Sequence, residues 1–351
     1  MKSRGLRLLA SAGALLACTE ATGPDPPRDT LELGRQLETL RQAHGIPGMA
    51  AAIGCGGSVR WSSGFGSADV ARGVPATPQT VFHIASLTKT FASIVLFQLV
   101  DEGRISLDDP VSDYGVELPG DVRVRHLMSH TSDPPPGSAF RYDGNRFALL
   151  DSVVRRADGR PFASAVLQRV IAPAALTRTA PSSLVGDGVD AVAIRAALAQ
   201  GYDGDGRPIG YPSDFNTAAG LLSTVLDLVA YGVAIEQDRL YPDGGRALAF
   251  TPMRSTSGAE LPYGLGWFVE HRNGGDVVWH FGSWIGNSAL LVLAPDRGAS
   301  FALLANSDRL STPFPLERGR LESSAFARAF LGWLEHGEGC GGQAARAIPP
   351  P

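Results

Sequence analysis

Lysine is nearly absent from this 351-residue chain, which has 31 lysine and arginine residues but only two lysines, Lys2 and Lys89. Arginine keeps its proton in proteins, whereas a desolvated lysine can lose it. The one lysine in the body of an otherwise arginine-based chain is therefore a candidate for proton transfer. The alternative is a lysine retained by chance on a solvated surface.

Charge is also scarce, and this excludes several classes of protein. Charged residues make up 19% of the chain, the formal net charge is -4 and no basic run occurs, so nucleic acid is excluded as a partner. The hydrophobic content of 44% excludes a disordered chain. The 42 glycines and 25 prolines exclude coiled coils and helical arrays. The length fits one large domain, or two that share a cleft.

The longest apolar run at the N-terminus is too short to span a bilayer. Basic residues up to Arg7 precede about ten apolar residues, Leu8–Ala17, as in a secretory signal. The run ends in Leu15-Leu16-Ala17-Cys18, which resembles a bacterial lipoprotein box with Cys18 as the lipidated residue. We expect an exported bacterial protein, anchored to a membrane and facing the periplasm or the cell exterior. The alternative is an ordinary signal cleaved a few residues later.

These features predict four segments. Residues 1–17 are a lipoprotein signal peptide, and 18–30 are a flexible, proline-rich tether. Residues 31–337 form the folded domain, and 338–351 are a disordered tail.

Cysteine is rare, which bears on both metal sites and disulfides. Beyond Cys18 only Cys55 and Cys340 remain, and no Cys/His spacing suggests zinc. In an exported protein the two can pair, provided that both ends of the chain contribute to one sheet. The sequence leaves this pairing open.

Hydrophobic periodicity changes along the chain. It predicts helices over 31–43, 88–102 and 323–336, a hairpin over 49–66, helical segments over 105–255, and strands at 277–281, 289–294 and 300–305. The predicted fold class is α/β of the α+β type. An antiparallel sheet built from both chain ends is flanked by helices and carries an inserted helical subdomain.

The strongest chemical signal is Ser86-Leu87-Thr88-Lys89. Spacing i, i+3 at the start of a helix places Ser86 and Lys89 on one face, where a neutral lysine can activate the hydroxyl. Lowering a lysine pKa to about 7–8 takes roughly 4 kcal/mol, part of which burial against Phe82 and Phe91 would supply.

The chain resembles the serine β-lactamase and penicillin-binding-protein-like family, and the class C branch with its esterase and D-peptidase relatives in particular. The resemblance covers about residues 35–335. It rests on motifs in family order: Phe82-His-Ile-Ala-Ser-Leu-Thr-Lys89, Leu107-Asp-Asp-Pro-Val111, Val124-Arg-His-Leu-Met-Ser-His-Thr-Ser132, Phe140-Arg-Tyr142, Phe147-Ala-Leu-Leu150, Ala219-Gly220-Leu-Leu-Ser-Thr224, Tyr263-Gly-Leu-Gly-Trp267, His280-Phe281-Gly282 and Leu304-Ala-Asn-Ser307.

The resemblance implies that Ser86 is the nucleophile and Lys89 the base. The family's second motif is Tyr-x-Asn. Here Tyr142 matches, but Gly144 stands where the asparagine belongs. Asn145 is a substitute for the missing amide only if the backbone shifts locally. The alternative for Tyr142 is a core aromatic with a satisfied hydroxyl.

The third motif is His280-Phe281-Gly282, in the form common among esterase-like relatives. By analogy with the family, Gly282 lets substrate lie close to the strand, and the Ser283 and Ser86 N–H groups form an oxyanion hole. His280 either hydrogen-bonds substrate or tunes Tyr142 and Lys89, unless it is a structural strand histidine.

Two further features have competing interpretations. His126 and His130 stand at i, i+4, which is metal-like spacing, but they match a structural segment of the family, so we expect no metal and no cofactor. The other feature is a set of tryptophans near the third motif, which either line an acyl pocket or pack the sheet: Trp267, Trp279 and Trp284.

These observations predict a serine hydrolase with an acyl-enzyme on Ser86, an esterase-like member of this family acting on a small ester, β-lactam or peptide. One alternative is a β-lactamase or a D-Ala-D-Ala carboxypeptidase or D-peptidase. Another is a catalytically weak penicillin-recognition or cell-wall-binding lipoprotein, because the Tyr-x-Asn amide is missing.

Overall fold

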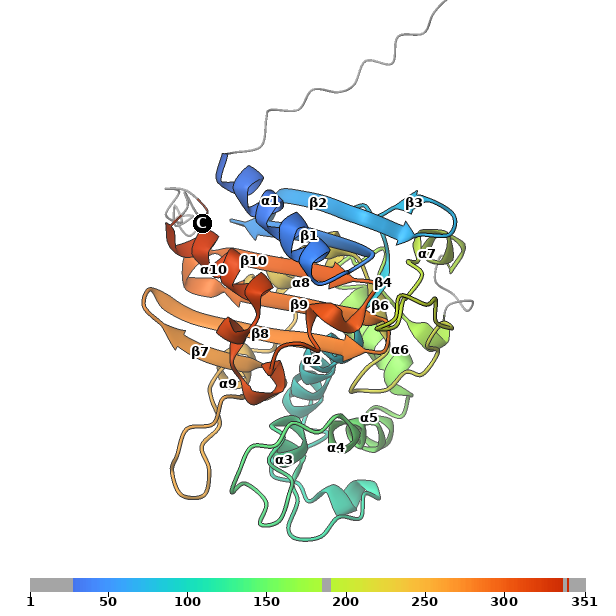
Figure 1. Ribbon diagram of the computed structural model, residues 1–351. Coiled ribbons are helices and arrows are strands. Elements are labelled where there is room, and N and C mark those ends of the chain that lie inside the picture. The colour runs from blue at the N-terminus through green and yellow to red at the C-terminus, as the bar shows by residue number, and fades with distance from the viewer. Residues whose placement is uncertain (1–27, 185–190, 337–339, 341–351) are drawn as a thin grey trace, which may run out of the picture.

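The computed structural model describes residues 28–184, 191–336 and 340 of the chain. Its centre is a seven-stranded sheet in the order β3-β2-β1-β10-β9-β8-β7 (Figure 1). All of its strand pairs are antiparallel. The strands are β1 Gly48–Cys55, β2 Ser58–Asp69, β3 Val74–Pro75, β7 Phe268–Arg272, β8 Gly275–Trp284, β9 Asn287–Ala294 and β10 Ala299–Ala305. Since β1 pairs directly with β10, the predicted sheet from both chain ends is confirmed.

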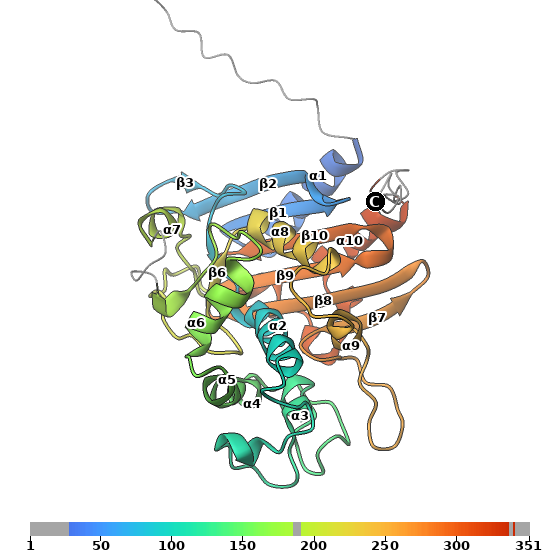
Figure 2. The ribbon, with the colours of Figure 1, turned by 180° about the vertical axis from the view of Figure 1, so that it is seen from behind.

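Helices cover both faces of this sheet. The first and last helices, α1 (Arg28–Ala43) and α10 (Ala325–His336), pack together on one face. On the opposite face lie α2 (Thr88–Asp101) and α8 (Val225–Glu236), which Figure 2 shows in front of the strands. The central strands β1, β9 and β10 are buried on both sides, and a separate hydrophobic core fills each interface.

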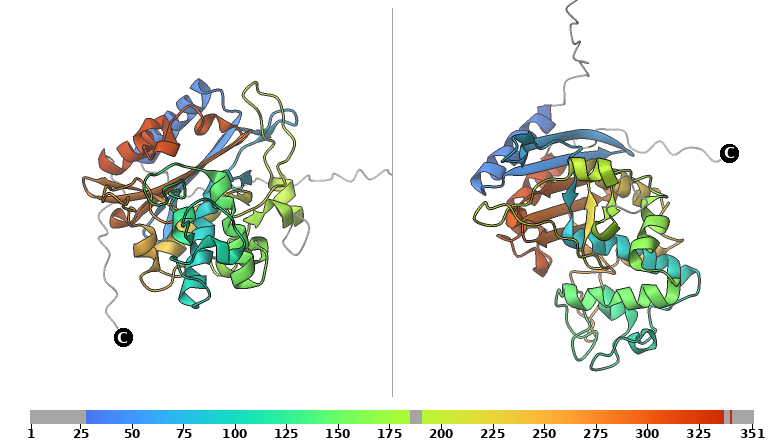
Figure 3. Two further views of the ribbon diagram at one scale, coloured as in Figure 1. Left: turned by 90° about the horizontal axis from the view of Figure 1, so that it is seen from below. Right: turned by 90° about the vertical axis from the view of Figure 1, so that its right-hand side faces the viewer.

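The predicted helical insertion is also confirmed. Figure 3 shows the segments between α2 and α8 gathered on the α2 side of the sheet. Among their elements are α3 Val124–Met128, α4 Gly144–Ala148, α5 Leu150–Asp158, α6 Phe162–Val166, β5 Ala180–Pro181 and α7 Ala191–Ala197. A small second sheet has the order β4-β6-β5, with β4 Phe82–His83 and β6 Leu221–Ser223, and α9 spans Gly245–Ala249.

Two helices start at other residues than the sequence predicted. Helix α1 starts at Arg28 rather than 31, because Asp29 accepts hydrogen bonds from the Thr30 N–H and from the Trp333 indole. At the other end, α10 starts at Ala325, after a separate 3₁₀ turn over 321–323.

A disulfide joins Cys55, at the end of β1, to Cys340 beyond α10, with Cα atoms 5.3 Å apart. The pairing that the sequence left open is therefore present. The signal peptide, Cys18, most of the tether and all of the predicted tail except Cys340 lie outside the described residues. Within the described residues, no helix has both the length and the apolar character needed to cross a bilayer.

Candidate active site

Ser86 lies in a tight turn between β4 and α2. The preceding Ala85 has a φ of 47°, a left-handed conformation that a residue with a Cβ adopts only where its surroundings enforce it. Two hydrogen bonds do so: the Ala85 N–H donates to His83 Nδ1 at 3.2 Å, and Thr88 Oγ1 donates to the Ala85 carbonyl at 2.7 Å. The turn leaves Ser86 partly exposed at the start of the helix.

Lys89 is fully buried beside Ser86. Its Nζ lies 3.0 Å from Ser86 Oγ and donates to the Ala218 carbonyl at 2.9 Å. Burial lowers the pKa of Lys89 to about 7, and the charge of Asp143 opposes the fall. A lysine with such a pKa is about half neutral at pH 7, so it can accept the Ser86 proton. The role of the Ala218 carbonyl could not be predicted from the sequence, because every residue has a backbone carbonyl and no residue type marks this one.

Tyr142 completes the wall around this amine. Lys89 Nζ lies 5.1 Å from the centre of the Tyr142 ring and 5.4 Å from that of Phe147. The buried Tyr142 hydroxyl makes no hydrogen bond of normal geometry within the described part of the chain. Burial raises the pKa of Tyr142, and the nearby Ser86 hydroxyl opposes part of that rise. Tyr142 therefore stays protonated at neutral pH and suits the role of proton donor, whereas Lys89 suits that of base.

His130 holds the loop that carries Tyr142. Its ring centre lies 4.3 Å from that of Tyr142, and its Nδ1 accepts a hydrogen bond from the Asp143 N–H. His126 instead accepts from the Arg123 N–H at the start of α3. The two histidines thus serve separate structural contacts. No group of three or more potential metal ligands occurs among residues 28–184, 191–336 and 340.

Gly144, not Asn145, faces the catalytic pair. A Cβ added to Gly144 would lie 3.8 Å from Lys89 Nζ, at ordinary contact distance. Asn145 is exposed, and no side-chain hydrogen bond joins it to Ser86 or Lys89 in the described structure. The local backbone shift that would let Asn145 supply the missing amide is therefore not observed.

Gly282 brings β8 against the Ser86 turn. A Cβ on Gly282 would lie 2.2 Å from the Ile84 carbonyl oxygen, so only glycine fits. The close contact is thus with the protein's own backbone, whereas a contact with substrate was expected from the sequence. Strand β8, which ends with Ser283 and Trp284, therefore packs against the turn over 85–87. Ser311 Oγ donates to the Gly282 carbonyl and fixes this end of β8.

His280 is fully buried, and both of its ring nitrogens have protein partners. Its Nε2 lies 2.9 Å from the Tyr263 hydroxyl, and its Nδ1 lies 2.6 Å from the Phe281 carbonyl oxygen. Burial, together with the charge of Lys89, holds the pKa of His280 well below its ordinary value. Both ring nitrogens are thus occupied within the protein, which leaves none for a direct bond to substrate. Of the other roles considered from sequence, the geometry fits a structural histidine packed near Tyr142, with ring centres 6.0 Å apart.

The tryptophans divide between the two interpretations. Trp267 and Trp279 are fully buried and pack the cores. Trp284 is 41% exposed at the end of β8, and its ring centre lies 6.2 Å from that of His83. Only Trp284 is therefore available as an apolar wall near the third motif.

Comparison with known proteins agrees with this geometry. A family model described as Beta-lactamase matches residues 33–325, most of the chain. Penicillin-binding protein 4* of Bacillus subtilis (strain 168) is 23% identical over 326 residues, covering 78% of this chain and 70% of that protein. D-aminopeptidase of Gluconobacter oxydans (strain 621H) is 25% identical over 336 residues, covering 81% of this chain and 63% of that protein.

The fold is shared with a solved structure, the octameric penicillin-binding protein homologue from Pyrococcus abyssi. It superposes with a TM-score of 0.73 at 22% identity and covers 87% of this chain and 77% of that chain. The match of the family model, the shared fold and the Ser86–Lys89 pair together establish that this chain belongs to the β-lactamase family of serine hydrolases.

Proposed function

We propose that this chain hydrolyses esters through a covalent acyl-enzyme on Ser86. The observation that carries the proposal is the contact between Ser86 Oγ and the buried Lys89 amine, 3.0 Å apart, with a lysine pKa of about 7. A nucleophile next to a neutral base is what acyl transfer needs.

Each residue of the site has its own role in the proposed acylation and deacylation. Neutral Lys89 takes the Ser86 proton while Oγ attacks the substrate carbonyl and the carbonyl π electrons move onto its oxygen. The Ser86 and Ser283 N–H groups stabilise that oxyanion, and losing one such donor typically costs about 10²–10³ in rate. As the oxyanion collapses and the ester C–O bond breaks, Tyr142 donates its proton to the leaving alcohol and recovers one from Lys89. Water then attacks the acyl-enzyme by the reverse proton path and releases the acid and free Ser86.

Two features favour esters over β-lactams. A β-lactam carries a carboxylate that a cation on the third-motif strand would hold, yet His280 at that position is buried and neutral. Its acylamino group needs the second-motif amide, and Gly144 has no side chain. An ester requires neither contact, and Trp284 offers an exposed apolar surface.

The D-aminopeptidase relative supports a second candidate, hydrolysis of peptides with D-residues. A third candidate is a weak penicillin-recognition protein with no turnover. The experiment compares kcat/KM for a short-chain nitrophenyl ester, a chromogenic cephalosporin and a D-Ala-D-Ala peptide on one preparation, with Ser86→Ala as the control. We expect the ester to be the best substrate and its turnover to depend on Ser86.

An equal or higher value for the cephalosporin, or strong peptidase activity, would overturn the ester preference. Turnover that survives in Ser86→Ala would overturn the mechanism, and a complete lack of Ser86-dependent turnover would favour a binding protein.

A further inference from the structure

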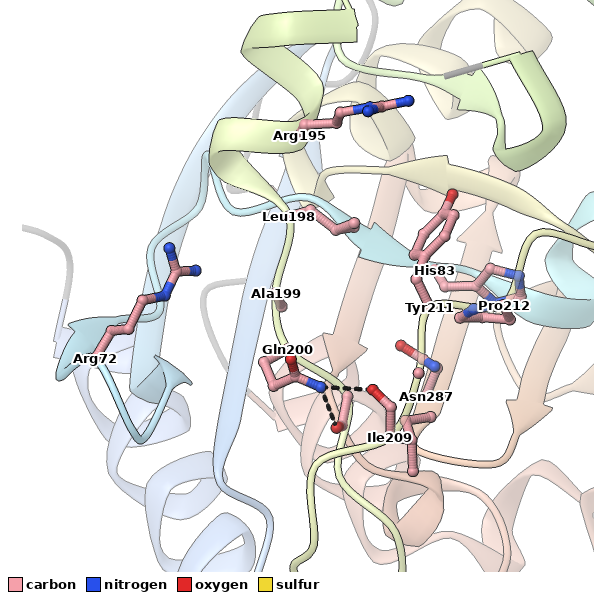
Figure 4. Close-up of a pocket in the computed structure, with 12 residues that line it drawn as sticks. Arg72, His83, Arg195, Leu198, Ala199, Gln200, Ile209, Tyr211, Pro212 and Asn287 are labelled. Carbon is pink, nitrogen blue, oxygen red and sulfur yellow. Dashed lines mark hydrogen bonds between the residues drawn. The ribbon is translucent and has the colours of Figure 1, made fainter. Parts of the chain in front are cut away.

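A separate small cavity lies beside the nucleophile turn, on the side of His83 (Figure 4). Its volume is about 130 Å³, room for roughly four water molecules or a small polar group of that size. Its walls come from four places that the chain brings together: the turn after β2, the start of the Ser86 motif, α7 with the loop after it, and the start of β9. The residues used below are His83, Arg195, Gln200, Tyr211 and Asn287.

His83 presents a hydrogen-bond donor without a partner. The Ala85 N–H donates to His83 Nδ1, so Nδ1 carries no proton and, in the neutral ring, the proton is on Nε2. Burial lowers the pKa of His83 to about 4, so the ring is neutral at pH 7. His83 is 3% exposed, and its Nε2 has no hydrogen-bond partner within the described part of the chain. A buried, unsatisfied N–H is costly, and a ligand acceptor would relieve that cost.

The charge around the cavity favours an anion. None of the twelve residues that line it is acidic, and two are arginines: Arg195, and Arg72, whose charge is paired with the Asp69 carboxylate at 2.7 Å. In Figure 4, His83 and Tyr211 lie between Arg195 and Asn287, and Arg72 lies farther out. Burial raises the pKa of Tyr211 to about 12, and a hydrogen bond with Ser182 and the nearby charge of Arg195 oppose that rise.

The cavity wall is held in place before any ligand binds. Gln200 Nε2 donates to the carbonyl oxygens of Gly201 and Ile209, which closes the loop between them. Asn287 is 4% exposed and starts β9. A site of this kind needs little rearrangement to accept a ligand.

The cavity is within reach of a substrate bound at Ser86. Only Ile84 and Ala85 lie between His83 and Ser86, so the Cα atoms of these two residues are at most about 11 Å apart. The side chains of His83 and Ser86 cover part of that distance, so a chain of a few carbon atoms between the scissile carbonyl and the ligand group can cover the rest.

We propose that this cavity is a substrate subsite that binds a carboxylate, with the His83 Nε2–H as its donor and Arg195 as the neighbouring cation. This inference rests on the proposed function and specifies its substrate class: esters with a free carboxylate near the scissile bond. The site differs from the third-motif strand, where His280 offers no charge.

The test uses two matched pairs of substrates on the native chain. One pair has the carboxylate on the acyl side: 4-nitrophenyl hemisuccinate and its methyl ester. The other has it on the leaving group: 3-carboxyphenyl acetate and its methyl ester. The readout is the ratio of kcat/KM for the free carboxylate over the methyl ester, which cancels differences in Ser86 reactivity.

His83→Asn is the informative variant, because its amide oxygen can still accept the Ala85 N–H while the Nε2 donor is lost. We expect one pair to favour the free carboxylate in the native chain, and His83→Asn to lower that ratio about tenfold or more. Arg195→Gln should lower it less, and only at low salt, because a partly solvated charge is screened. An unchanged ratio in both pairs for His83→Asn would overturn the subsite.

A binding measurement separates failure of the subsite from failure of the proposed function. In Ser86→Ala, which cannot turn over substrate, titration with succinate should shift the ¹⁵N resonances of the His83 ring and saturate. A saturable shift supports the subsite even if no ester is hydrolysed. Absence of any shift at tens of millimolar succinate would overturn it even if ester hydrolysis is confirmed.

Discussion

Replacing Lys89 with methionine should abolish activity and yet stabilise the fold at neutral pH. Burial lowers the pKa of Lys89 from its ordinary 10.5 to about 7. Between these two values the folded chain holds the amine neutral while the unfolded chain protonates it. Unfolding then takes up a proton, so this lysine makes the free energy of unfolding rise with pH from about 7 to 10.5 and fall as pH is lowered through that range.

The magnitude follows from the same pair of values. At about 1.4 kcal/mol per pKa unit, the buried lysine costs on the order of 4 kcal/mol at pH 7 and about 2 kcal/mol at pH 9. Methionine fills similar space without that cost, but it leaves the Ala218 carbonyl without its donor, a loss of about 1–3 kcal/mol that does not depend on pH. The net gain is about 1–3 kcal/mol at pH 7, and it shrinks by about 2 kcal/mol at pH 9.

The assay is urea unfolding of the native chain, Lys89→Met and Ser86→Ala at pH 7 and pH 9. Ser86→Ala is the matched control, since it is equally inactive but keeps the lysine, and its difference from the native chain should vary little with pH. A stability difference for Lys89→Met that is the same at both pH values would refute the lowered pKa. In the activity assay Lys89→Arg should fail as Lys89→Met does, because arginine keeps its proton.

Three further predictions test other parts of the structure. Gly282→Ala should lower the free energy of unfolding by about 1–3 kcal/mol and lower the acylation rate, because the new Cβ would collide with the Ile84 carbonyl. A variant with native stability and native kinetics would contradict that contact. Cys340→Ser should lower the free energy of unfolding by about 2–5 kcal/mol, since the bond to Cys55 closes a 285-residue separation, and reductant should then have no further effect. Cys18→Ser should release the protein from membranes or block its processing, and a native protein found wholly soluble with its N-terminus beyond Cys18 would disprove the anchor.

The central strands could be predicted because they are apolar on both faces. The runs over 289–294 and 300–305 match β9 and β10 closely, since burial in the middle of the sheet leaves little room for polar residues. Strand β7 was missed because it lies at the sheet edge and contains Glu270, His271 and Arg272, which mask a strand pattern. The start of α1 was missed because the contact from Asp29 to Trp333 joins opposite ends of the chain.

The residues of the candidate site likewise differ in whether the sequence alone could predict their roles. Ser86 and Lys89 were evident because helical spacing alone brings them together. The reason why residue 282 must be glycine could not be predicted. It is the contact with Ile84, which is distant in the sequence and is placed against β8 only by the fold. His83 gave no signal either: only the Ala85 hydrogen bond and the surrounding cavity reveal its unpaired donor.

The most direct test of the account is the site of acylation. The native chain and Ser86→Ala are each exposed to an activated ester, quenched in acid and analysed by peptide mass spectrometry. The account predicts one acyl group per chain, on the peptide that contains Ser86, and none in Ser86→Ala. Acylation of a different residue, or label that persists unchanged in Ser86→Ala, would contradict it.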